Sequence, residues 1–69
     1  MKHDYENNTI VIESDEEAFN EGLDIGLLDW VAYYPEVDKV TIVFADERKM
    51  TYVFSDLSYM DTFMEYMNK

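Results

Sequence analysis

The stretch at residues 9–17, TIVIESDEE, joins a strand to the start of a helix, and this junction decides how the chain can fold. Its first five residues are rich in β-branched side chains, which predicts a short strand. Ser14 is followed three residues later by Glu17, the capping-box pattern of a helix N-terminus. We therefore expect a helix with Ser14 as its N-cap, in which Asp15, Glu16 and Glu17 lie at the positive end of the helix dipole.

The apolar spacing after this cap predicts that the helix continues to about Tyr34 and stops before Pro35, because proline disfavours a helical residue before it. Steps of 100° per residue place two apolar stripes on this helix. The first stripe, which we expect to face the core, consists of Phe19, Leu23, Leu27, Trp30, Val31 and Tyr34. The second consists of Ala18, Ile25, Leu28 and Ala32, and Gly22 and Gly26 leave a smooth strip between the two stripes.

A helix that is apolar on two sides is either covered twice or exposes one side to a partner. A chain of 69 residues has little material for double coverage. The second stripe therefore predicts a homodimer, in which matching surfaces of two copies meet. The expected dimer interface consists of Gly22, Ile25, Leu28 and Ala32.

The remaining elements follow from alternating patterns and turn residues. Asn7 and Asn8 are suited to a turn that folds residues 2–6 back as an edge strand. Residues 39–45 and 50–54 read as an antiparallel hairpin around a charged turn, and Ser55 is expected to cap a last helix that runs to about Met67. The chain is thus predicted to form one α+β domain over residues 1–69. Its order is (β)βα-ββα, with a small antiparallel sheet of three or four strands and two helices on one face.

The charge is strongly negative, with 16 acidic side chains against 5 Lys and Arg and a net charge of −11. Such a negative field attracts cationic partners and repels nucleic acid. Proteins bind nucleic-acid phosphates through Lys and Arg, which are few in this chain. The chain contains no Cys and no apolar run as long as a membrane span, so we expect a cytoplasmic protein without a membrane partner.

Residues that carry catalysis are scarce. The only His is His3, near the chain start, and no thiol is available as a nucleophile. Gly22 and Gly26 lie within the predicted helix, where they form no phosphate-binding loop. No EF-hand pattern occurs among the acids. We therefore predict no enzyme activity, no catalytic residue, no metal site and no cofactor.

The carboxylates themselves are the candidate binding residues. Rows at i, i+4 and i+7 of a helix repeat at about 5–6 Å, a spacing of the same order as phosphates along a nucleic-acid strand. Glu17, Glu21 and Asp24 form such a row, Glu13, Asp15 and Glu16 extend it at the helix start, and Asp29, Glu36 and Asp38 extend it past the end. The alternative is a solvated acidic face that serves solubility.

In size, charge and aromatic content the whole chain resembles the small acidic inhibitors encoded by phages and mobile elements. That class includes uracil-DNA glycosylase inhibitors, overcome-restriction decoys, anti-CRISPR proteins and inhibitors of the host sliding clamp. The resemblance implies a DNA mimic that occludes the DNA-binding surface of a host enzyme during host takeover. An acidic adaptor or immunity-type protein, which neutralises a basic partner without imitating DNA, is the alternative.

Overall fold

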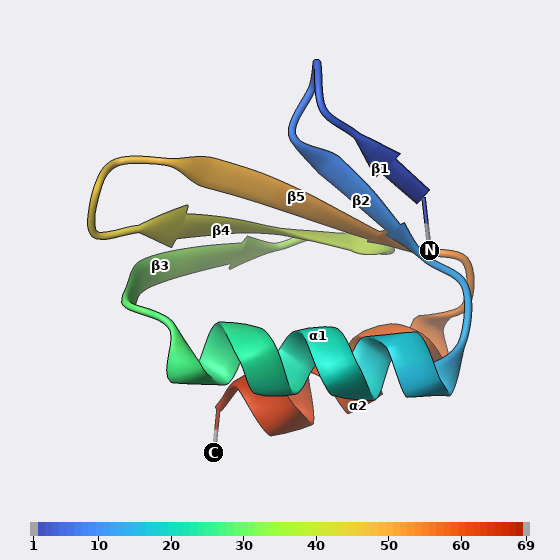
Figure 1. Cartoon of the computed structure of the whole chain (residues 1–69). Coiled ribbons are helices and arrows are strands. Elements are labelled where there is room, and N and C mark those ends of the chain that lie inside the picture. The colour runs from blue at the N-terminus through green and yellow to red at the C-terminus, as the bar shows by residue number, and fades with distance from the viewer. Residues whose placement is uncertain (1, 69) are drawn as a thin grey trace.

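Five strands form one mixed sheet, and both helices lie on the same face of it (Figure 1). The computed structural model describes residues 2–68. The strands are β1 (Lys2–Asp4), β2 (Thr9–Ile12), β3 (Trp30–Pro35), β4 (Lys39–Phe44) and β5 (Lys49–Phe54), and the helices are α1 (Asp15–Leu27) and α2 (Leu57–Met67). The α+β class and the two helices are confirmed. The number of strands is higher than predicted, and the element order is ββαβββα.

The strand order is β1-β2-β5-β4-β3, which differs from the antiparallel sheet that we predicted. β4 and β5 form the predicted antiparallel hairpin, but β2 pairs with β5 in parallel, with Ile10 beside Tyr52 and Ile12 beside Phe54. α1, β3 and β4 separate these two strands in the chain, so no local pattern could reveal the pairing.

One face of the sheet forms the core together with the helices. The buried strand residues are Ile10, Ile12, Val40, Ile42, Phe44, Tyr52 and Phe54, and the buried apolar helix residues are Ala18, Ile25, Phe63 and Met67. Phe63 of α2 is fully buried, and its ring lies 5.0 Å from that of Tyr52 and 5.2 Å from that of Phe54. The centre of the core is thus an aromatic contact between α2 and β5.

The predicted hairpin at the chain start is present, with a longer turn than expected. β1 pairs antiparallel with β2 across residues 5–8, and Asn8 has a positive φ of 51°. Asp4 supports the turn, since its Oδ1 accepts hydrogen bonds from the N–H groups of Glu6 and Asn7.

The helix α1 ends at Leu27, so the predicted continuation to Tyr34 is wrong. Residues 30–35 form β3 instead, as their aromatic and β-branched side chains favour. Pro35 does act as a terminator, but it ends a strand rather than a helix.

The two apolar faces of α1 are exchanged relative to the prediction. Ala18, Gly22 and Ile25 are its buried residues, whereas Phe19, Leu23 and Leu27 are 38%, 42% and 79% exposed. Two of the four residues predicted for the dimer interface, Gly22 and Ile25, therefore lie inside the monomer, and a third, Ala32, lies on β3. Small side chains face α2 because they allow the two helix backbones to approach closely.

Within residues 2–68, neither helix is both long and apolar enough to cross a membrane.

Candidate binding surface at the acidic end

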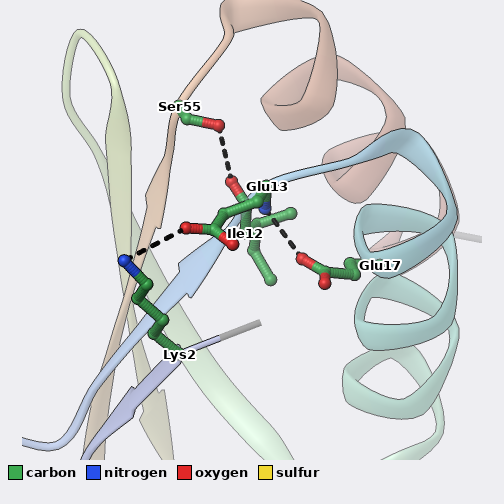
Figure 2. Close-up of polar contacts among 5 residues, drawn as sticks. All are labelled: Lys2, Ile12, Glu13, Glu17 and Ser55. Atoms are coloured by element: carbon green, nitrogen blue, oxygen red, sulfur yellow. Dashed lines mark hydrogen bonds and ion pairs between the residues drawn. The ribbon is translucent and has the colours of Figure 1, made fainter.

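The start of α1 is held by two reciprocal hydrogen bonds. Ser14 Oγ accepts from the Glu17 N–H at 3.2 Å, as the capping-box pattern predicts. Glu17 Oε2 accepts from the N–H of Glu13 at 2.8 Å, one residue before the N-cap (Figure 2). The carboxylate of Glu17 therefore fixes the chain as it enters the helix.

Long-range backbone contacts bring two other segments to this end of the molecule. The Ser55 Oγ donates to the carbonyl of Ile12 at 3.2 Å (Figure 2). The Ser55 N–H donates to the same carbonyl at 3.1 Å. The Phe54 N–H donates to the carbonyl of Asp38 at 2.8 Å. The β3–β4 turn and the start of α2 thus lie beside the start of α1.

Seven carboxylates gather here as a result, and we call this region the acidic end. It comprises Glu13, Asp15, Glu16, Glu17, Glu36, Asp38 and Asp56. Six of the seven belong to the set predicted from sequence. The sequence placed Glu36 and Asp38 in a separate group beyond a long helix, whereas the shorter helix and the return of β3 bring them back to its start.

Two lysines partly offset this charge. Lys2 Nζ lies 3.7 Å from Glu13 Oε1 (Figure 2), and Lys39 Nζ lies 3.4 Å from Glu36 Oε2. Both pairs are exposed, so water and salt screen them and each contributes little to stability. The acidic end keeps an excess of negative charge with both lysines counted.

The predicted row Glu17, Glu21 and Asp24 is less uniform than a row of exposed carboxylates. Glu17 is half-buried and bonded to Glu13, and Glu21 is half-buried as well. Burial, reinforced by the negative charge of Asp24, raises the pKa of Glu21 above its ordinary value. Asp24 is the one member of the row whose side chain is exposed.

Asp29 lies away from the acidic end. Its carbonyl accepts from the Ala45 N–H at 3.0 Å, next to the β4–β5 turn that carries Asp46 and Glu47. The predicted second group of acids is thus divided between opposite ends of β3.

Asp56 is a member of the acidic end that the sequence analysis missed. It is the N-cap of α2, and its Oδ1 accepts from the N–H and the hydroxyl of Ser58 at 2.9 and 3.0 Å. These hydrogen bonds lower the pKa of Asp56. The prediction that Ser55 caps this helix is therefore wrong by one residue. Asp and Ser are both strong N-cap residues, so the local pattern does not decide between these neighbours.

The positions of the acidic residues follow the secondary structure. The strands β2, β3, β4 and β5 contain no Asp or Glu, so the carboxylates lie on helices, turns, caps and the short strand β1. Among residues 2–68, no three acidic or His side chains lie close enough together to hold a metal ion. The acidic end is therefore a spread surface of charge rather than a convergent cage.

Comparisons with protein-family models, curated proteins and solved structures found no match for this chain.

Proposed function

We propose that this chain is an acidic inhibitor that binds and occludes the positively charged nucleic-acid-binding surface of a host enzyme in the cytoplasm. The observation that supports this most directly is the acidic end, where three segments contribute seven carboxylates and, within residues 2–68, two lysines are paired with them. Such a surface attracts a basic groove electrostatically and excludes nucleic acid from it.

The irregular spacing of the exposed carboxylates on α1 favours a second candidate function, an acidic adaptor. An acidic adaptor neutralises a basic partner without imitating a duplex, and it needs no regular spacing. Because Glu17 is occupied by its contact with Glu13 and Glu21 is half-buried, the helical row is not a regular series of exposed charges. Duplex mimicry therefore rests on the whole acidic end rather than on α1 alone.

Capture from a lysate of the host cells, with the bound proteins identified by mass spectrometry, tests the proposal. We expect nucleic-acid enzymes to be retained at low salt and released as the salt concentration rises, because screening weakens exposed charge pairs. Retention that does not depend on salt would contradict the proposal.

Competition separates the two candidates. A DNA mimic occupies the groove of its target, so duplex DNA should displace it from that target, whereas an adaptor bound elsewhere should stay. The variant Glu16→Lys/Asp38→Lys reverses two charges of the acidic end, and it should lose the target. Its control is Asp61→Lys/Glu65→Lys, which makes the same change in net charge on exposed positions of α2. Equal retention of both variants would exclude the acidic end as the binding surface.

A further inference from the structure

The strand β3 leaves one side of the sheet open. It is last in the strand order and pairs only with β4, so its outer side has no strand partner among residues 2–68. Figure 1 shows it along this edge of the sheet, above α1. Exposed edges are usually protected by charged side chains or by a covering element, because their free N–H and C=O groups accept further strands. β3 has the sequence WVAYYP and carries no charge.

The register shows which backbone groups face outward. At the turn between β3 and β4, the Glu36 N–H donates to the carbonyl of Lys39 at 2.7 Å. Hydrogen-bonded and non-hydrogen-bonded pairs alternate along an antiparallel ladder. Counting back from Glu36, the backbone of Tyr34 faces β4 and the backbone of Tyr33 faces away from it. The side chains of Val31 and Tyr34 are 63% and 60% exposed. The open edge thus combines free backbone groups with uncovered apolar side chains.

A second copy of this chain is a poor occupant of the edge. Antiparallel pairing of β3 with itself would place Asp29 opposite Glu36 of the other copy at both ends of the new ladder. Like charges opposite each other destabilise a strand pair. Each chain also brings a net charge of −11. Charge complementarity instead favours a strand with basic residues at its ends, in either direction.

A depression at the Trp30 end of the strand suits a basic side chain. It has a volume of about 300 Å³ and is lined by Leu28, Asp29, Phe44, Ala45, Asp46 and Arg48. Leu28, Phe44 and Ala45 provide an apolar surface for an aliphatic stem, and Asp29 provides a carboxylate for its charged head. Asp46 is already engaged, since its Oδ2 lies 3.8 Å from Arg48 Nε. Arg48 already lies over the ring of Phe44, with its guanidinium carbon 4.7 Å from the ring centre, so the depression already accommodates a cation.

We propose that the outer edge of β3 binds an extended segment of another protein, an apolar strand flanked by Lys or Arg, which adds to the sheet as a sixth strand. Main-chain hydrogen bonds supply affinity in such strand addition, and flanking side chains supply specificity. This surface adjoins the acidic end at Glu36 and consists otherwise of the backbone edge of β3, and the proposal stands whether or not the partner is a nucleic-acid enzyme.

Three fluorescein-labelled peptides test the proposal by fluorescence anisotropy. The first is Lys-Lys-Val-Thr-Val-Thr-Val-Lys-Lys, the second replaces every Lys with Glu, and the third keeps the lysines around a Pro-Gly core that forms no strand. We expect the first to bind at least about tenfold more tightly than either of the others, a difference of about 1.4 kcal/mol. If the Pro-Gly peptide binds as well as the first, charge alone drives binding and the proposal is overturned.

Variants of the chain locate the site. Tyr33→Pro removes the outward N–H and leaves the β3–β4 ladder in place, since proline is tolerated on the solvent side of an edge strand. It should weaken binding of the first peptide about tenfold, whereas Tyr33→Ala keeps the N–H and should weaken it less. Asp29→Asn should weaken binding about threefold, and Asp61→Asn, which changes net charge equally on α2, should not. Full affinity in a folded Tyr33→Pro variant would overturn the proposal.

Amide hydrogen exchange on the unmodified chain gives a readout that does not depend on the folding of any variant. The Tyr33 N–H should exchange more slowly when the first peptide is bound, because it then donates to the added strand. An unchanged exchange rate at Tyr33 under saturating peptide would also overturn the proposal.

Discussion

Gly22 of α1 lies directly against the backbone of Phe63 in α2. A Cβ at position 22 would come within 2.5 Å of the Phe63 carbonyl oxygen and 3.1 Å of its Cα. Backbone atoms cannot rotate away as a flexible side chain can. The absence of a side chain at position 22 therefore sets the distance between the two helices. This close contact explains why the small residues of α1 face inward.

Gly22→Ala should destabilise the fold although alanine favours helix. Overpacking costs about 1–3 kcal/mol and the gain in helix propensity returns about 1 kcal/mol, so we expect a net loss of up to about 2 kcal/mol. Thermal unfolding should show a decrease in Tm of about 4–8 °C per kcal/mol for a domain of this size. Asn20→Ala on the exposed side of α1 is the control and should be neutral or slightly stabilising. Stabilisation by both substitutions would contradict the close contact.

Phe63→Leu should cost more than any change on the surface of α2. The ring is fully buried between Tyr52 and Phe54, and a smaller side chain leaves a cavity there. Phe63→Ala at such a site costs about 3–5 kcal/mol, close to the whole stability of a small domain, so the milder variant keeps the measurement within range. Leu57→Ala is the control, because Leu57 is 57% exposed and should change the free energy of unfolding by less than about 0.5 kcal/mol. If Phe63→Leu and Leu57→Ala lowered the free energy of unfolding equally in denaturant, Phe63 would not be the centre of the core.

Ser14→Ala should reduce stability by about 1 kcal/mol, because the Glu17 N–H loses its acceptor at the helix start. Ser14→Asp keeps an acceptor at the N-cap and should stay within about 0.5 kcal/mol of the unmodified chain. Urea unfolding followed by circular dichroism measures both. If the two variants were equally stable, the side chain of Ser14 would not contribute as an N-cap.

Glu21→Gln should stabilise the fold at neutral pH and lose this effect in acid. Burial and Asp24 raise the pKa of Glu21 in the folded chain above the ordinary value of 4.5. The neutral form is thus favoured in the fold, and its stabilising contribution is complete below pH 4.5 and is lost as the pH rises through the raised pKa. The free energy of unfolding of the variant should therefore be higher than that of the unmodified chain at pH 7 and equal to it below pH 4.5.

The measurement for Glu21→Gln is the free energy of unfolding at several pH values between 4 and 8. Glu65→Gln makes the same change in net charge at an exposed position of α2 and serves as the control. An advantage of Glu21→Gln that persists unchanged below pH 4.5, where the carboxyl is already neutral, would point to a charge-independent effect of the glutamine side chain rather than to the half-buried carboxylate.

The elements with strong local signals were predictable. The strand at β2, the cap at Ser14 and the β4–β5 hairpin each depend on residues that are neighbours in the chain, so their patterns carry enough information. The end of α1 was not predictable from the sequence, because residues 28–34 are apolar at helical spacing and are also rich in strand-forming side chains. The local pattern does not decide between the two, whereas pairing with β4 does, since it satisfies the backbone of Trp30–Pro35 in a sheet.

The wrong end of α1 also led to a wrong assignment of its buried and exposed faces. With Trp30, Val31 and Tyr34 counted as helical, the large side chains defined a core stripe and the small ones were assigned to a dimer. In the fold, Phe19 remains 38% exposed and lies edge-on to Tyr66, while Gly22 faces the core. Hydrophobicity alone ranks Phe above Gly for burial, but two packed helices need small residues where their backbones meet.

By itself the sequence determined the sign and size of the charge, the α+β class, the start of α1 and the β4–β5 hairpin, because these follow from composition and from contacts between near neighbours. Only the tertiary structure decided that Asp38 and Asp56 join the acids at the start of α1, and that β3 forms an open edge. Both depend on contacts between segments far apart in the chain, such as Ser55 with Ile12 and Phe54 with Asp38. Such contacts form only when the whole core packs.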